Sequence, residues 1–298
     1  MSSGFIALDW GTSSFRAYLL GPDGAIQETV AAPHGIMAVK DAAFDEALET
    51  HIGKWHRNLP VMASGMITSR QGWLELPYVS CPANLQSIAA SVRPHTSKQG
   101  RKLFFVPGIS CRNAQGIPDV IRGEETQVLG ASQGGTEHFV TPGTHSKWID
   151  VSDGSIEGFS TYMTGEVFAL LKNHSILGKL MTGETNNPAA FEQGVRADLK
   201  DPAGFLHHIF SARTLALFNE MPTEHLSSYL SGQVIATEIA HAIAKNTVNA
   251  QYVILATPAL GEHYMAAMKI AGLNVSYGEL DVAVKGLRRI AITAGLLS

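Results

Sequence analysis

The chain contains the same short arrangement of residues twice. Asp9–Ile26 reads "DWGTSSFRAYLLGPDGAI", and Thr141–Ile156 reads "TPGTHSKWIDVSDGSI". Each copy has Gly-Thr-x-Ser at a turn, then the alternation of a half-buried strand, and then an Asp-Gly turn. The spacing from the turn glycine to Asp-Gly differs by two residues between the copies, which preserves the faces of the strand. The repeat predicts two similar halves, each opening with a strand, a turn and a strand.

A Gly-Thr-x-Ser turn presents closely spaced backbone N–H groups and two hydroxyls. Glycine lets the backbone approach a ligand, and amides and hydroxyls can donate to phosphate oxygens. One such turn alone is ordinary hairpin chemistry. Two of them, facing each other across a cleft, would hold a polyphosphate from both sides.

Composition narrows the class of protein. The 298 residues suffice for two domains, 45% are hydrophobic and 16% are charged, which is typical of a globular chain. The formal charge of −4, without a basic cluster, argues against nucleic acid as a partner. No apolar run is long enough for a membrane span, and the N-terminus does not resemble a secretory signal. Two cysteines form neither a disulfide framework nor a zinc pattern, so we expect a cytoplasmic protein.

Hydrophobic periodicity predicts alternating strands and helices without a long linker. The stretch "PDVIRGEETQVLGAS" is predicted to form a helix entered through Pro118. The expected strands are 5–8, 15–19, 25–30, 61–66, 104–106, 139–140, 148–151, 155–159 and 252–256. The expected helices are 41–57, 118–132, 165–174, 189–199, 213–220, 231–245, the segment after "TPALG", and the C-terminal segment.

Several stretches together resemble one known family. An N-terminal strand ending in Asp-x-Gly-Thr-x-x-x-Arg, followed by a second Gly-Thr loop, is similar to the phosphate motifs of the actin, sugar-kinase and heat-shock ATPase superfamily. Within it, "ALDWGTSSFRAYLL", "ASGMITSRQGW", "RGEETQVLGA", "TPGTHSKWIDV" and "YMTGEVFALLKNHSILG" resemble the 2-dehydro-3-deoxygalactonokinases, in order along the whole chain. The resemblance implies an α/β fold of two ribonuclease-H-like (actin-like ATPase) domains with an ATP cleft between them.

The resemblance also implies ATP and Mg²⁺ as cofactors and a small sugar acid as the substrate. We place the domains at 1–135, on the sugar-acid side, and 136–298, on the nucleotide side. For the last helix, about 282–298, packing against the first domain is an alternative to packing within the second. A homo-oligomer is left open.

The cofactor-binding residues follow from the two loops. Asp9 lies where a buried strand meets the first loop and can hold Mg²⁺ through water, or it can cap the turn. Lys147 adds a positive charge beside the second loop, and Gly261 resembles the glycine of a turn beneath adenine or ribose. The loop residues expected to contact ATP phosphates are Gly11, Thr12, Ser13, Ser14, Gly143, Thr144, His145 and Ser146.

The catalytic residues are expected in "RGEETQ" and beside the first loop. Phosphoryl transfer to a hydroxyl needs charge stabilisation and a carboxylate that accepts the hydroxyl proton. Related sugar kinases have an Asp here, whereas this chain has only Glu124 and Glu125; we favour Glu124, which follows Gly123. Both can instead be first-turn glutamates favoured by the helix dipole. Arg16 can neutralise phosphoryl charge or be a charge on the strand surface.

The substrate residues are expected in two loops. The "TSRQGW" stretch offers Ser69, Gln71 and Trp73, with Arg70 as partner of the substrate carboxylate or as one half of a surface ion pair. The "YMTGE" stretch offers Thr164 and Glu166, and Glu166 can bind substrate hydroxyls or cap its own helix.

The predicted function is ATP-dependent phosphorylation of the C6 hydroxyl of 2-dehydro-3-deoxy-D-galactonate, which gives the 6-phosphate and ADP. Two alternatives keep the fold. One is a nucleotide-dependent switch whose ATP hydrolysis drives partner binding, and the other is a phosphatase acting on polyphosphate or nucleotides.

Overall fold

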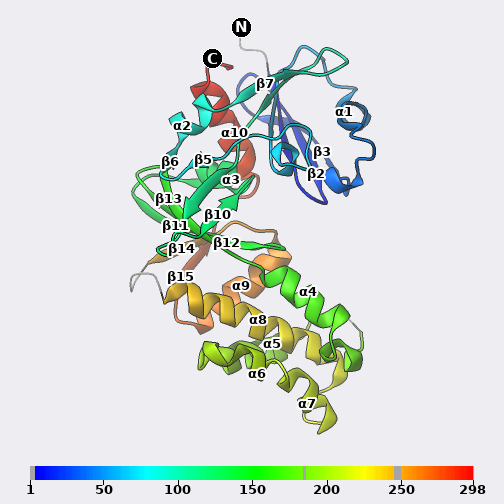
Figure 1. Ribbon diagram of the computed structural model, residues 1–298, viewed down its shortest axis with the longest axis vertical. Helices are drawn as coiled ribbons and strands as arrows, with labels where there is room; N and C mark the ends of the chain where they lie inside the picture. The colour runs from blue at the N-terminus through cyan, green and yellow to red at the C-terminus, as the bar shows by residue number, and fades with distance from the viewer. Residues whose placement is uncertain (1–3, 184–185, 245–249, 298) are drawn as a thin grey trace. The chain divides into compact units, whose positions relative to one another are not determined.

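The computed structural model of the protein describes residues 4–183, 186–244 and 250–297. The described chain divides into two compact units, which can be followed by colour along Figure 1. Unit 1 comprises the described residues of Met1–Thr136, Asp150–Phe159 and Asp281–Ser298, and unit 2 comprises those of Glu137–Ile149 and Ser160–Leu280. Predicted helix ends at Lys245 and Ser298 lie outside the described residues.

Unit 1 is built on a mixed sheet of order β3-β2-β1-β4-β8-β7. Strand β2 pairs antiparallel with both β1 and β3, whereas β1, β4 and β8 run parallel to one another. Every side chain of β4 is buried, as expected for a central parallel strand. The strands are β1 (Phe5–Trp10), β2 (Phe15–Leu20), β3 (Ile26–Ala32), β4 (Val61–Ser64), β7 (Arg93–Thr96) and β8 (Lys102–Phe105).

A second, small sheet and several helices complete unit 1. Its order is β10-β9-β5, and β6 pairs with the first residues of β13. The C-terminal helix α10 lies beside α3 (Figure 1). The elements are β5 (Val79–Ser80), β6 (Ala83–Asn84), β9 (Ile109–Arg112), β10 (Pro118–Ile121), α1 (Phe44–Ile52), α2 (Leu85–Ala90), α3 (Glu124–Ala131), α10 (Val282–Thr293) and the 3₁₀ turns Ile36–Ala38 and Met66–Thr68.

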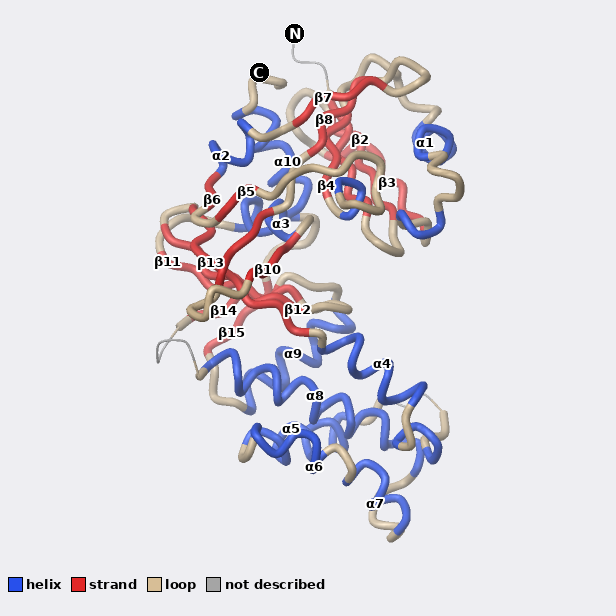
Figure 2. Tube along the Cα trace, in the orientation of Figure 1, coloured by secondary structure: helices blue, strands red, loops and turns tan. Residues whose placement is uncertain are grey.

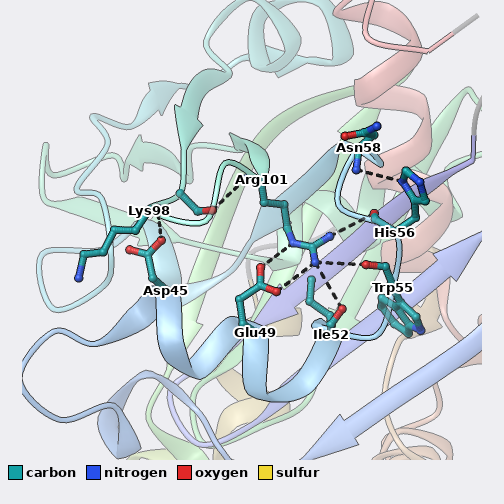
Figure 3. Close-up of polar contacts among 9 residues, drawn as sticks. Asp45, Glu49, Ile52, Trp55, His56, Asn58, Lys98 and Arg101 are labelled. Atoms are coloured by element: carbon teal, nitrogen blue, oxygen red, sulfur yellow. Dashed lines mark hydrogen bonds and ion pairs between the residues drawn. The ribbon is translucent and has the colours of Figure 1, made fainter.

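A buried arginine, Arg101, directly precedes strand β8 and is hydrogen-bonded to α1 (Figure 3). Arg101 has no exposed surface, and its Nε donates to Glu49 Oε1 at 2.8 Å. Its terminal nitrogens donate to the carbonyls of Ile52, Trp55 and His56. Because a buried charge is tolerated when it is paired and hydrogen-bonded, this guanidinium serves the fold.

The second large sheet has the order β15-β14-β11-β12-β13-β6, in which β11, β14 and β15 are parallel. Counted along the chain within each large sheet and leaving β6 aside, the first four strands have the order third, second, first, fourth in both. The repeated order confirms the predicted α/β fold with two ribonuclease-H-like halves. The strands are β11 (Thr136–Thr141), β12 (Ser146–Ser152), β13 (Ser155–Tyr162), β14 (Gln251–Ile254) and β15 (Asn274–Tyr277).

The rest of unit 2 is helical, and Figure 2 shows α5, α6 and α8 gathered together. The helix α8 is central: Ile235, Ala236 and Ile239 belong to the sheet-side core, whereas Leu226, Leu230 and Val234 belong to a second core among helices. The helices are α4 (Thr164–His174), α5 (Pro188–Leu199), α6 (Phe205–His208), α7 (Ser211–Leu217), α8 (Leu226–Ile243), α9 (Pro258–Ile270) and the 3₁₀ turns Leu177–Leu180, Pro202–Gly204 and Thr223–His225.

One predicted helix is wrong in its first part. Pro118–Ile121 forms strand β10, antiparallel to β9, and the helix begins only at Glu124. Gly123 separates them with φ +109°, a backbone conformation outside the helical region. Strand β9 ends only a short turn earlier, at Arg112, and its antiparallel pairing with β10 in a hairpin overrides the helical appearance of this stretch.

No helix in the described ranges combines the length and the apolar composition that a membrane span requires.

Candidate functional site

The first Gly-Thr loop connects β1 to β2 and is held by a neighbouring segment of unit 1. The amide of Gly11 donates to Ser14 O at 2.9 Å, and the amide of Ile36 donates to Gly11 O at 3.0 Å. A Cβ on Gly35 would lie 2.2 Å from the carbonyl oxygen of Thr12, so only glycine fits against the loop. The loop backbone is therefore fixed. The exposed residues of the loop are Thr12, Ser13 and Ser14.

Asp9 is the centre of a charged group in unit 1. In the sheet it lies opposite Arg16 of β2 and beside Ser64 of β4. Its Oδ1 lies within 3.0 Å of where a Cβ on Gly65 would be, and Gly123 is next to Gly65. Burial raises the pKa of Asp9 to about 6, Arg16 opposes this rise, and Glu124 adds to it. Asp9, Arg16 and Glu124, which come from separate motifs, thus lie near one another in unit 1.

The two adjacent glutamates have different surroundings. Glu124 is half-buried, and its Oε2 accepts from the amide of Arg122 at 3.0 Å. Glu125 has no exposed surface; its Oε2 accepts from the amide of Gly123 at 2.7 Å. Burial, with a further contribution from Glu124, raises the pKa of Glu125 to about 8. A base must reach a substrate hydroxyl, and the accessible Glu124 meets that condition better.

The "TSRQGW" residues are dispersed over different environments of unit 1. Arg70 is 86% exposed and only 4.0 Å from Glu75, a surface ion pair. Gln71 is also exposed, whereas Ser69 is buried and its Oγ has no partner. The ring of Trp73 packs against Phe44, with 6.0 Å between ring centroids, as part of the core. The structure does not bring these side chains together into one pocket, and their substrate roles stay predictions.

Arg122 received no role from the sequence, although it directly precedes "GEET". Its Nη1 donates to Thr68 Oγ1 at 2.6 Å, and its Nη2 donates to the carbonyl of Leu76 at 3.2 Å. The signal that could have identified Arg122 was its position as the cation at the start of the motif "RGEETQVLGA". It connects the "TSRQGW" segment to the start of α3.

In unit 2, the second Gly-Thr loop lies against the start of α4. The amide of Glu166 donates to Thr144 O at 3.0 Å, and a Cβ on Gly165 would lie 2.5 Å from Gly143 O. His145 Nε2 and Glu166 Oε2 are 2.6 Å apart, and both side chains are partly exposed. Lys147 follows on β12, half-buried. The loop therefore presents Thr144 and His145 outward.

A buried carboxylate on α8, Glu238, underlies this loop and was missed by sequence reasoning. Its Oε1 accepts from Ser146 Oγ and from Trp148 Nε1, each at 2.7 Å. Its Oε2 accepts from Tyr264 at 2.6 Å and from Thr164. Burial raises its pKa, while the four donors act in the opposite direction. The hydroxyls of Ser146 and Thr164 are therefore directed inward, to Glu238. Its signal was a single acid in the apolar stretch "VIATEIAHAI".

A cavity of about 390 Å³ opens beside the second loop, entirely within unit 2. Its wall is partly apolar and partly made of hydroxyl and amide groups, with one lysine and one glutamate. Gly261 lies in the first turn of α9 and faces Tyr277, while its neighbours Leu260 and Glu262 line the cavity. The lining residues are Gly143, Thr164, Gly165, Phe168, Lys172, Asn186, Ser227, Ser228, Ser231, Val234, Ile235, Ala259, Leu260, Glu262, His263 and Tyr264.

The described residues include no group of three or more His, Cys, Asp or Glu side chains able to hold a metal ion. Asp9 is the carboxylate that directly precedes the first loop. One carboxylate is compatible with Mg²⁺, which usually keeps several waters and is bound also by substrate phosphates.

Comparison with known proteins gives the family. A model of the family described as 2-keto-3-deoxy-galactonokinase matches residues 9–290. The chain is 36% identical to a probable 2-dehydro-3-deoxygalactonokinase of Rhizobium meliloti (strain 1021), over 94% of each chain. It is 32% identical to the 2-dehydro-3-deoxygalactonokinase of Escherichia coli (strain K12), over 98% of each.

A solved structure is similar along nearly the whole chain as well. It is the crystal structure of a candidate 2-dehydro-3-deoxygalactonokinase protein from Sinorhizobium meliloti, with a TM-score of 0.89 and 35% identity. The match covers 96% of this chain and 98% of that one. The resemblance seen in the motifs is confirmed: the chain belongs to the 2-keto-3-deoxy-galactonokinase family.

Proposed function

We propose that this kinase transfers the γ-phosphoryl group of ATP to the C6 hydroxyl of 2-dehydro-3-deoxy-D-galactonate. The observation that carries the proposal is the match over 98% of the chain to a relative whose name states this acceptor. In the reaction, the C6 oxygen forms a bond to the γ-phosphorus as the bond to the ADP oxygen breaks. The proton of the hydroxyl goes to a carboxylate.

Unit 1 supplies the carboxylate that accepts the hydroxyl proton and the groups that stabilise the phosphoryl charge. Glu124 accepts the proton because its carboxylate is half-buried and accessible, unlike that of Glu125. Arg16, exposed and opposite Asp9 in the sheet, stabilises the charge that develops on the phosphoryl oxygens. Asp9 would hold Mg²⁺ through water. When bound, the ion neutralises charge on the ATP phosphates.

Unit 2 supplies the nucleotide pocket. A cavity of about 390 Å³ with apolar walls and a few polar groups is of the size and character of small-molecule sites. We place adenosine there and the phosphates toward the second loop, whose Gly143 lines the cavity and is followed by Thr144 and His145. His145 can donate to phosphate while Glu166, 2.6 Å away, orients the imidazole ring.

We also propose a cytoplasmic location, consistent with the free thiols of Cys81 and Cys111.

The test is ADP formation by the purified protein with Mg-ATP, with and without the sugar acid, and with its gluconate epimer. We expect rapid ADP formation only with 2-dehydro-3-deoxy-D-galactonate. Equal ADP formation without any sugar acid would contradict the proposal and favour a switch ATPase or a phosphatase. Equal rates with both epimers would show that the kinase accepts sugar acids of either configuration, so the proposal would hold only for the substrate class.

A further inference from the structure

Unit 1 contains a second inward-facing guanidinium besides Arg101, and its surroundings differ. Arg122 is half-buried between β10 and α3, and its guanidinium lies 4.3 Å from the centroid of the Tyr78 ring. Arg101 is neutralised by Glu49 (Figure 3). By contrast, no carboxylate in the part of the chain that the structure describes lies within 4.0 Å of the Arg122 guanidinium.

The hydrogen-bonding capacity of Arg122 is only partly used. A guanidinium has five N–H donors, and those of Arg122 reach Thr68 Oγ1 and Leu76 O. Its Nε is buried and has no hydrogen-bond partner among the residues that the structure describes. Arg122 interacts electrostatically with the buried Glu125, but this does not satisfy the Nε donor. Because burying an unpaired donor is costly, the guanidinium is suited to a further acceptor supplied by a ligand.

The neighbours of Arg122 fix the plane of the guanidinium. Thr68 has no exposed surface and bonds to the carbonyls of Gly65 and Val106, so it is a rigid partner. With Thr68 on one side and the Tyr78 ring against its face, the guanidinium is preorganised. A planar, oriented guanidinium binds a carboxylate through two parallel hydrogen bonds.

A second unused donor belongs to the same segment. Ser69 is 6% exposed and its Oγ has no partner, although it directly follows Thr68. Two residues beyond Arg122 stands Glu124, the proposed base. One short region of unit 1 thus combines a cation, an unpaired hydroxyl and the proton acceptor.

We propose that Arg122 binds the carboxylate of the sugar-acid substrate, so that the chain recognises C1 there and activates the C6 hydroxyl at Glu124. This inference rests on the proposed function. It replaces Arg70 as carboxylate partner, because Arg70 is at the surface and its cation is solvated.

The test compares the sugar acid with its neutral amide in wild type and in Arg122→Met. In wild type, kcat/KM for the acid should exceed that for the amide by about 10- to 100-fold, the size of a charge-assisted hydrogen bond. In Arg122→Met the acid should lose this advantage, while kcat/KM for the amide and the KM for ATP stay unchanged. Arg122→Lys, which keeps the charge without the fork, should fall between the two.

Arg112→Met is the matched control, because Arg112 is exposed and also donates to a backbone carbonyl, that of Gly116. It should keep the wild-type preference for the acid. An equal loss for acid and amide in Arg122→Met would mean that Arg122 only holds its loop, and would overturn the inference. So would loss of the preference in Arg70→Met instead. Failure of the proposed function is distinguishable, since wild type would then not phosphorylate the acid at all.

Discussion

Glu124 and Glu125 are adjacent in sequence, yet one side chain is half-buried and the other has no exposed surface. Successive helical residues point about 100° apart, so the first turn of α3 directs only one of them toward Asp9. Electrostatic coupling of Asp9 to Glu124 agrees with this arrangement. At the residue scale, the assignment of the base therefore depends on accessibility.

Replacing Glu124 by Gln removes the proton acceptor and keeps the shape of the side chain. We expect kcat to fall by about 10²- to 10⁴-fold, with the KM for ATP little changed. Steady-state ADP formation with saturating sugar acid measures this. Glu220→Gln, at an exposed position of unit 2, is the control. Wild-type turnover in Glu124→Gln would remove Glu124 from the role.

Glu125 should make stability depend on pH. Its pKa rises from 4.5 to about 8, chiefly through burial, so between these values the folded chain keeps a proton that the unfolded chain has lost. The free energy of unfolding should therefore decrease as pH rises, by up to about 1.4 kcal/mol per pH unit. Glu125→Gln cannot lose that proton, and its decrease should be smaller. Urea denaturation from about pH 5 to about pH 8 measures both slopes; equal slopes would contradict the account.

At the scale of elements, α10 positions α3 through two glycines. A Cβ on Gly286 would lie 1.8 Å from Thr126 O, and one on Gly130 would lie 1.9 Å from Val282 O. The two helices approach too closely for any side chain at these positions. Because Glu124 starts α3, this packing also fixes the proposed base.

Gly286→Ala should lower the free energy of unfolding by about 1–3 kcal/mol, since an overpacked contact forces the helices apart. It should also lower kcat through displacement of α3. Gly158→Ala is the control, because a Cβ there meets no heavy atom within 4 Å. Thermal unfolding and kcat are measured for both. An unchanged Gly286→Ala protein would show that the helix pair does not need this close approach.

In unit 2, Glu238 connects the second loop, α4, α8 and α9 through four accepted hydrogen bonds. Glu238→Gln keeps the shape but loses the charge that these donors face. We expect the KM for ATP to rise about 10-fold or more, since a hydrogen bond to a charged group contributes about 1.5–3 kcal/mol. The KM for the sugar acid should stay unchanged, a separation that general loosening would not give.

Thr237→Val is the control for that change, because the Thr237 hydroxyl bonds only to the carbonyl of Gln233 on its own helix. Its KM for ATP should match that of wild type. A rise in the KM values of both substrates in Glu238→Gln would indicate a loss of fold and not of the nucleotide pocket.

The sequence predicts best what depends on local pattern. The strands of both halves follow from turn glycines and from the alternation of apolar residues. The closeness of Glu124 to Asp9 and Arg16 does not, because it joins distant segments of the chain. Strand β10 is missed because Pro118–Ile121 has the pattern of a helix start, although it pairs in a hairpin with the neighbouring β9. Glu238 and the cavity depend on four segments that meet only in the folded unit. Trp73 is an aromatic residue of the kind found in sugar-binding sites, but it is partly buried and packs against the core. Local sequence does not distinguish these two roles.

At the scale of the whole molecule, the first four strands have the same order in both large sheets, and a Gly-Thr loop follows the first strand of each. The repeat observed in the sequence is therefore a repeat of the fold. Unit 1 carries the proposed proton acceptor and the carboxylate partner, and unit 2 carries the proposed nucleotide pocket. This division of work accounts for two loops of the same type in one chain.

The most direct test of phosphoryl transfer is the product stoichiometry of a single reaction with Mg-ATP and 2-dehydro-3-deoxy-D-galactonate. ADP, inorganic phosphate and phosphorylated sugar acid are quantified together by ³¹P NMR, with the position of the phosphate read from its coupling to the C6 protons. We predict equal amounts of ADP and the 6-phosphate, without free phosphate. ADP accompanied by an equal amount of inorganic phosphate, with no phosphorylated sugar acid, would contradict the account.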